Sequence, residues 1–216
     1  MPSANPGLSR LAARDRLWLG LLLLIVLSVL LWSGHEPKDR FTWFLEVLPV
    51  LLGLPLLLLT YRRFPFTRLA YGLMTLHAVI LMIGGHYTYS EMPLFEWLQA
   101  EFGWARNHYD RLGHVAQGFV PAILAREILL RTSPLRPGKW LAFLVLCVAL
   151  SISAFYEFLE WWVALASGDE AVAFLATQGD VWDTQWDMLL AWLGAMAALL
   201  LLSGVHDRQL RQRGFL

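Results

Sequence analysis

Long apolar runs separated by short polar connections dominate this sequence. Each run has about the 20 residues that a helix needs to cross a hydrocarbon core of about 30 Å. Because lipid offers no hydrogen-bond partner to a bare backbone, each run is expected to be helical. The pattern predicts six membrane spans, at residues 17–33, 42–61, 69–87, 112–130, 140–165 and 181–203.

The composition agrees with this pattern. Hydrophobic residues make up 57% of the 216 residues and charged residues only 16%, which is too few to cover the surface of a soluble globular protein. We therefore predict an all-α, polytopic membrane protein whose residues 1–216 form a single domain. The first apolar run lacks a small-residue cleavage pattern, so we interpret it as a retained anchor. The lone cysteine, Cys147, excludes an intramolecular disulfide.

The distribution of lysine and arginine predicts the orientation of the bundle. Thirteen of the 17 basic residues lie before the first span, in alternate connections or at the end of the fourth span, and after the last span. The other four are Lys38, Arg40, Arg106 and Arg111. Since basic residues are retained on the cytoplasmic side, both termini are predicted to be cytoplasmic.

The longest outer connection, residues 88–110, joins the third and fourth spans and has an amphipathic pattern of its own. Leu94, Leu98 and Phe102 recur at helical spacing with glutamates between them. This spacing predicts a short helix lying in the outer membrane interface.

Polar residues that would be costly in lipid gather at the outer ends of several spans. Each set follows helical spacing, so each forms a stripe on one face of its helix. Their shared height and facing predict a water-accessible pocket that opens outward. The stripes are Asp110, His114 and Gln117; Glu157 and Glu160; and Asp180, Asp183 and Asp187.

So many carboxylates in a confined pocket cannot all stay ionised without a neutralising cation. One solution is protonation of some acids, which suits proton transfer. The other is a divalent metal ion, because carboxylates and a histidine projecting from facing helices form metal sites in bundles. For this second case the predicted ligands are Glu157, Glu160, Asp183, Asp187 and His114. The predicted catalytic residues are His114, Asp110 and Glu157, and the predicted substrate contacts are His86, Tyr87, Gln117 and Asp180.

Purely structural roles compete with several of these assignments. Asp180 precedes a helix and could be only its N-cap, and Asp183 lies in a first turn, where the helix dipole favours an acid. Glu157 could pair with Arg111 between helices. At the opposite end of the fourth span, Arg126 and Glu127 are interpreted as snorkelling and capping residues.

Several strings also carry a family resemblance, among them "RNHYDRLGHVAQGFVPAILAREILLR", "SISAFYEFLEWW" and "TQGDVWDTQWDMLLAWLGA". From about the third span to the end, the chain resembles the YjdF family of bacterial inner-membrane proteins. More loosely, the polar pattern is similar to VanZ-like membrane proteins. The first resemblance implies a location in the bacterial inner membrane, and the second implies work on a lipid head group. Glu160 and the pair Trp161 and Trp162 depart from that second pattern.

Three functions fit these features. The first is metal-dependent hydrolysis of a lipid-linked or envelope phosphoester, with membrane lipid as the partner. The second is proton- or cation-coupled transport, although the sequence has no internal repeat and the inner halves of the last two spans are apolar. In the third, the polar residues form a structural network in a non-enzymatic accessory protein. Nucleic-acid binding is not expected, because membrane topology accounts for the basic residues.

Overall fold

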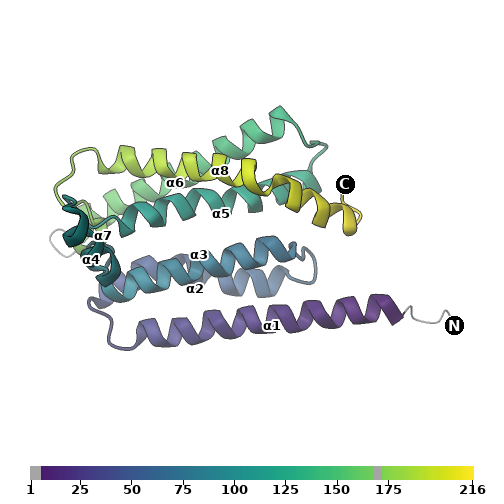
Figure 1. Ribbon diagram of the computed structural model, residues 1–216, viewed down its shortest axis with the longest axis horizontal. Coiled ribbons are helices and arrows are strands. Elements are labelled where there is room, and N and C mark those ends of the chain that lie inside the picture. The colour runs from purple at the N-terminus through teal and green to yellow at the C-terminus, as the bar shows by residue number, and fades with distance from the viewer. Residues whose placement is uncertain (1–5, 168–171) are drawn as a thin grey trace.

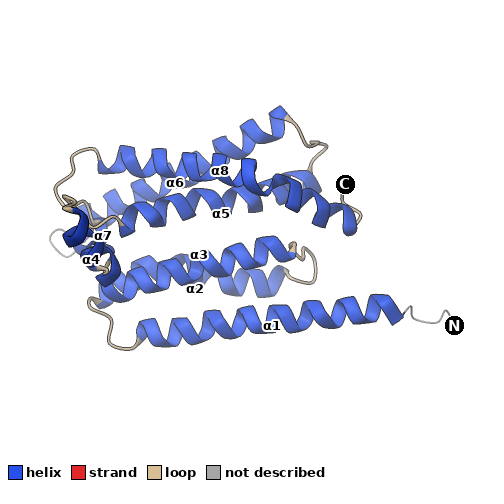
Figure 2. Cartoon of the chain, viewed as in Figure 1, coloured by secondary structure: helices blue, strands red, loops and turns tan. Residues whose placement is uncertain are grey.

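The computed structural model describes residues 6–167 and 172–216, and none of these residues forms a strand (Figure 2). The predicted single domain also includes residues 1–5 and 168–171, which lie outside the described residues. The elements are α1 (Pro6–Gly34), α2 (Arg40–Thr60), α3 (Arg68–Tyr87), the 3₁₀ turn η1 (Tyr89–Glu91), α4 (Pro93–Phe102), α5 (Tyr109–Thr132), α6 (Lys139–Ser167), α7 (Val172–Leu175) and α8 (Asp183–Gln212).

The long helices form two layers (Figure 1). One layer contains α1, α2 and α3, and the other contains α5, α6 and α8. Contacts between α3 and α5 join the layers, and α5 also packs against α6 and α8. The short helices α4 and α7 lie at one end of the bundle, opposite the C-terminus and the beginning of α1 (Figure 1).

Within the described residues, five helices are long and apolar enough to cross a membrane, which confirms a multi-span, helical membrane protein. They are α1 from Asp15 onward, α2, α3, α6 and α8. The helix α5 has 24 residues, about 36 Å at 1.5 Å per residue, but is more polar than the others. Its polar side chains point into the bundle, where Asp110, His114, Arg126 and Glu127 are all buried.

Local capping explains where several helices begin and end. Asp39 accepts a hydrogen bond from Thr42 N at 2.6 Å and so caps α2, while Thr67 accepts one from Ala70 N at 3.3 Å and caps α3. Pro93 suits the first turn of α4, and Gly103, at φ 63°, ends that helix in the left-handed region.

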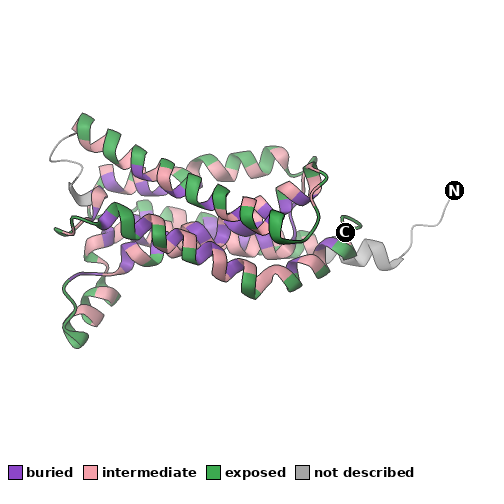
Figure 3. Cartoon of the chain, turned by 90° about the horizontal axis from the view of Figure 1, so that it is seen from above, coloured by how far each residue is buried: buried purple, intermediate pink, exposed green. Residues whose placement is uncertain are grey.

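The helix predicted in the connection between the third and fourth spans is present as α4. It projects from the bundle (Figure 3) and packs inward through Phe95, whose ring lies 5.4 Å from that of Tyr109. Leu94, Trp97 and Phe102 are more than half exposed. Its outward face is therefore strongly apolar.

The helices α5 and α8 are in unusually close contact because a glycine of each helix faces the backbone of the other helix. A Cβ atom on Gly118 would lie 1.6 Å from the carbonyl oxygen of Ala191, and one on Gly194 would lie 2.2 Å from that of Val115. Small residues allow such approach between membrane helices. This contact aligns the polar residues of α5 with those of α8.

A buried polar network joins α3, α5 and α8 at the end of the bundle where the chain terminates. Both oxygens of Glu127 are paired: they accept from Thr67 N at 3.0 and 3.1 Å, from Arg131 Nη1 at 2.8 Å and from Thr67 Oγ1 at 2.8 Å. Glu127 Oε2 also lies 3.1 Å from His206 Nε2. The prediction that Arg126 and Glu127 only snorkel and cap is wrong, because both are buried and their charges are paired across helices.

The contact between α5 and α8 gives a stability prediction. Gly118→Ala places a methyl group on the Ala191 carbonyl, so it should lower the free energy of unfolding by about 1–3 kcal/mol or more. Gly20→Ala is the matched control, because a Cβ at that helical position meets nothing within 4 Å. Thermal unfolding in detergent should show a lower Tm for Gly118→Ala alone. Equal melting of both variants and wild type would contradict the close approach of α5 and α8.

Candidate functional site

His114 lies at the centre of the polar residues that the sequence predicts to line a shared pocket. It is buried in α5, and its neighbours on the same helix face are Asp110, one turn before it, and Gln117, one turn after it. The distance from His114 Nε2 to Asp110 Oδ1 is 3.5 Å, and that from Nδ1 to Gln117 Oε1 is 3.1 Å. The stripe predicted from the sequence is thus present, and it faces other helices rather than lipid.

Two further helices bring carboxylates to the same imidazole. Glu157 Oε1 of α6 lies 3.9 Å from His114 Nδ1, and Asp187 Oδ2 of α8 lies 3.9 Å from His114 Nε2. Two sets of candidate ligand atoms share His114, and the atoms of each set lie within 4.8 Å of one another. Such separations suit ligands placed around a common ion at about 2.0–2.6 Å. The two sets are Asp110, His114 and Asp187, and His114, Glu157 and Glu160.

Several buried oxygens around His114 have no hydrogen-bond partner among the described residues. Among these atoms are Glu157 Oε1 and Asp187 Oδ1, whose residues are only 6% and 3% exposed. A buried polar atom without a partner costs about 1–3 kcal/mol, and more when it carries charge. A cation bound at either ligand set would neutralise the carboxylate of that set, Glu157 in one and Asp187 in the other.

A small cavity of about 40 Å³ adjoins His114. Roughly 10–15 Å³ suffices for one water molecule, so the cavity has room for an ion with water. Glu46 of α2, to which the sequence analysis gave no role, also lines it. Its walls are formed by Glu46, His77, Leu81, Tyr89, Asp110, Gly113, His114, Gln117, Tyr156 and Glu160.

Two tyrosines supply hydroxyl groups to this cavity. The hydroxyls of Tyr89 and Tyr156 are buried and have no partner among the described residues. Burial, and then the charge of Glu46, raise the pKa of Tyr89 well above its usual range. Its hydroxyl therefore stays protonated at neutral pH and can donate to a carboxylate or a phosphoryl oxygen.

An arginine that sequence reasoning did not select organises the mouth of the site. Arg106 is buried; it forms an ion pair with Asp183, and its Nη2 lies 3.4 Å from Asp110 Oδ2 and donates to Ala176 O at 3.1 Å. Asp183 is thus held by an arginine and belongs to neither candidate ligand set. The signal in the sequence was the spacing of four residues between Arg106 and Asp110.

Other predicted site residues lie at the entrance to the cavity or away from the cavity. Asp180 accepts from Arg111 Nη2 at 3.0 Å and from Trp182 N at 3.0 Å, so it joins an ion pair and also caps the turn before α8. His86 and Tyr87 are not brought to the cavity. His86 Nδ1 instead lies 3.1 Å from Ser33 O, and the centre of its ring lies 4.4 Å from that of Trp32 of α1, with the two rings tilted to each other.

Comparison with known proteins places this architecture in a family. Residues 18–208 match the family described as "Predicted membrane protein (DUF2238)". The chain is also similar to "Inner membrane protein YjdF" of Escherichia coli (strain K12), with 52% identity over 188 residues, covering 87% of this chain and 90% of the relative. No solved structure matches the chain. The resemblance to the YjdF family is confirmed, and the chain belongs to the DUF2238 family of predicted membrane proteins, as a multi-pass protein of the bacterial inner membrane.

Proposed function

We propose that this protein binds a divalent metal ion beside His114 and uses it to hydrolyse a phosphoester in a lipid head group or an envelope substrate. The observation that carries the proposal is the pair of buried carboxylates of Glu157 and Asp187, which approach His114 from two helices and each keep one oxygen without a partner among the described residues. Unpaired carboxylate oxygens in a bundle core are what a cation site requires.

The ligand set narrows the choice of ion. One imidazole with several carboxylates suits a borderline or hard ion, such as Zn²⁺ or Mn²⁺, better than a soft one. His114 is the ligand shared by both candidate sets, with Asp110 and Asp187 on one side and Glu157 and Glu160 on the other. Asp183, paired with Arg106, is left out of this set and positions that arginine instead.

The expected reaction follows from this arrangement. A divalent ion would activate a water molecule and polarise the phosphoryl oxygen. With the ion held by His114, Glu157 and Glu160, the carboxylate of Asp110, which lies 3.5 Å from His114 Nε2, would be free to accept the proton from that water. The water oxygen would form a bond to phosphorus while the bond from phosphorus to the ester oxygen breaks, and the alcohol would leave with the proton that Asp110 had accepted. Gln117 and Tyr89 are positioned to orient the phosphate.

In the proposed topology α5 is a sixth span, and both termini are cytoplasmic. This arrangement is supported by the position of α5 inside the bundle and by the C-terminus lying at the same end as the beginning of α1 (Figure 1). The cavity and α4 then lie on the outer side. With Leu94, Trp97 and Phe102 exposed, α4 is suited to rest in the outer interface and present lipid to the site.

Two observations weigh against the alternatives. A transporter needs a polar path to the other face, but tightly packed apolar residues lie toward the inner end from the cavity, including Ile123, Val145 and Ala195. A purely structural network should pair its oxygens, as the inner network pairs both oxygens of Glu127. The outer oxygens of Glu157 and Asp187 lack such partners among the described residues.

Metal content tests the proposed site. Wild-type protein purified in detergent and supplemented with Mn²⁺ or Zn²⁺ should retain near-stoichiometric metal by elemental analysis. The double variant Glu157→Gln, Asp187→Asn should bind it at least ~10–100-fold more weakly, because it loses two charged ligands. Asp207→Asn, which removes an acid from the inner network, is the control and should retain the metal. Equal metal content in both variants, or none in wild type, would exclude the proposed site.

Topology is tested with the chain's single cysteine removed. In a Cys147→Ser background, Glu101→Cys on α4 and Arg211→Cys at the end of α8 introduce exposed thiols. A membrane-impermeant thiol reagent applied to cells with a permeabilised outer membrane should label the Glu101→Cys variant. It should leave the Arg211→Cys variant unlabelled until the inner membrane is lysed. The reverse pattern, or labelling of both, would contradict the orientation.

A further inference from the structure

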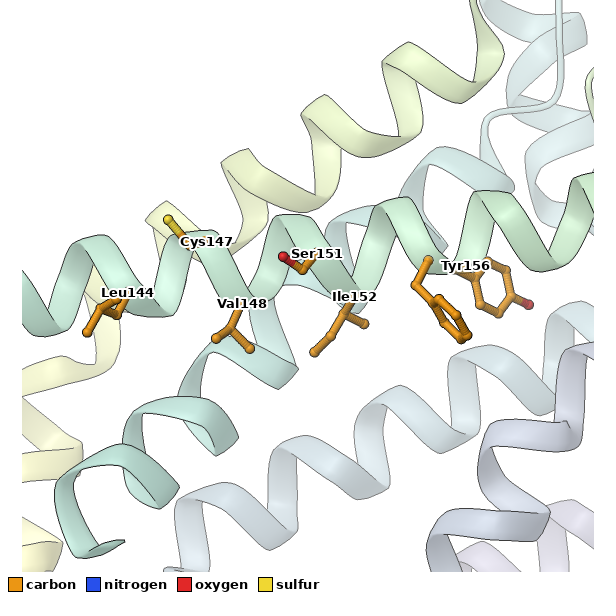
Figure 4. Close-up of a pocket in the computed structure, with 7 residues that line it drawn as sticks. Leu144, Cys147, Val148, Ser151, Ile152 and Tyr156 are labelled. Carbon is orange, nitrogen blue, oxygen red and sulfur yellow. The ribbon is translucent and has the colours of Figure 1, made fainter. Parts of the chain in front are cut away.

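A second hollow, much larger than the cavity that adjoins His114, runs along the membrane-facing side of α6. Its volume is about 450 Å³. Leu144, Val148, Ile152 and Tyr156 repeat every four residues, so their side chains lie along one face of the helix (Figure 4). We refer to this hollow as the α6 groove, lined by Leu144, Cys147, Val148, Ser151, Ile152, Phe155 and Tyr156.

The α6 groove leads to the polar cavity. Tyr156 lines both hollows, and its hydroxyl is buried without a partner among the described residues. On the cavity side of Tyr156 lie the carboxylates of Glu46 and Glu160. On the groove side, Ile152 and Phe155 are exposed apolar side chains. The open apolar groove and the polar cavity therefore share one lining side chain, that of Tyr156.

The dimensions of the α6 groove match a lipid tail. From Leu144 to Tyr156 the helix advances 12 residues, or about 18 Å. Half of a hydrocarbon core of about 30 Å is about 15 Å, the thickness of one leaflet. A chain that begins at the cavity and follows this groove therefore stays at membrane depth over its whole length.

We propose that the α6 groove holds one acyl chain of a glycerophospholipid, whose phosphate-bearing head group lies at the polar cavity beside Tyr156. This inference rests on the proposed function, since it names a glycerophospholipid as the substrate that the metal site would act on. Substrate would then enter laterally from the bilayer, past α6, rather than from the aqueous phase. Tyr156 acts as a positioning residue between tail and head group.

The side chains within the groove support a tail as the occupant. Ser151 is small and leaves depth between Val148 and Phe155, where a larger residue would fill the hollow. The exposed neighbour Leu150 points away from the groove and does not line it. These two adjacent positions therefore provide a groove-filling variant and a matched control on the same helix.

The experiment measures phospholipid retained by the protein. Wild type, Ser151→Trp and Leu150→Trp are purified in dodecyl maltoside, incubated with phosphatidylglycerol and examined by native mass spectrometry, with metal analysis on the same samples. Wild type and Leu150→Trp should retain tightly bound phosphatidylglycerol, while Ser151→Trp should show at least roughly tenfold lower occupancy. If Ser151→Trp does not elute as folded protein in size-exclusion chromatography, Ile152→Trp takes its place.

The two readouts separate this inference from the proposed function. Loss of phospholipid only in Ser151→Trp would support the α6 groove as the acyl-chain site, whether or not the samples contain metal. Absence of metal from all three samples would overturn the proposed metal site alone. Equal lipid retention in Ser151→Trp and Leu150→Trp would overturn the groove even if metal is bound. A dimer that is lost only in Ser151→Trp, with unchanged lipid, would also overturn it and assign the surface to a second copy of the chain.

Discussion

The architecture depends on the cost of placing charged side chains at membrane depth. The helix α5 carries Asp110 and His114 near one end and Arg126 and Glu127 near the other, and lipid can satisfy none of them. Covering the helix with α3, α6 and α8 is therefore a condition for its insertion into the bundle. The glycines at 118 and 194 permit the close contact with α8 that brings Asp187 within 3.9 Å of His114.

The two ends of α5 meet this cost in different ways. At the C-terminal end of α5, Glu127 is surrounded by Thr67, Arg131 and His206, and both of its oxygens are hydrogen-bonded. These bonds connect three helices. At the N-terminal end of α5, Arg106 binds Asp183 and approaches Asp110, but one oxygen each of Glu157 and Asp187 has no partner in the part of the chain that the structure describes. A network built only for stability has no reason to leave buried carboxylate oxygens without partners. That difference separates a structural cluster from a candidate site.

Helical periodicity and length were enough to predict the helical bundle and the stripe of Asp110, His114 and Gln117, because both depend on local spacing. The sequence also placed Glu157 and Asp187 at the height of His114, from rise per residue alone. It could not show which acid pairs with which arginine. Arg106 lies outside the apolar pattern, and its partner Asp183 is far away in sequence. The pairing of Glu127 with His206 was missed for the same reason. The contact of His86 with α1 could not be predicted either, because helical periodicity does not specify which helix a side chain will face.

Pulsed electron paramagnetic resonance of the Mn²⁺-loaded protein tests most directly whether His114 is a metal ligand. The account predicts that the bound ion shows hyperfine coupling to one imidazole nitrogen, and that this coupling disappears in His114→Gln while His77→Gln retains it. A bound Mn²⁺ whose nitrogen coupling survives His114→Gln, or that shows only oxygen ligands in wild type, would contradict a site centred on His114.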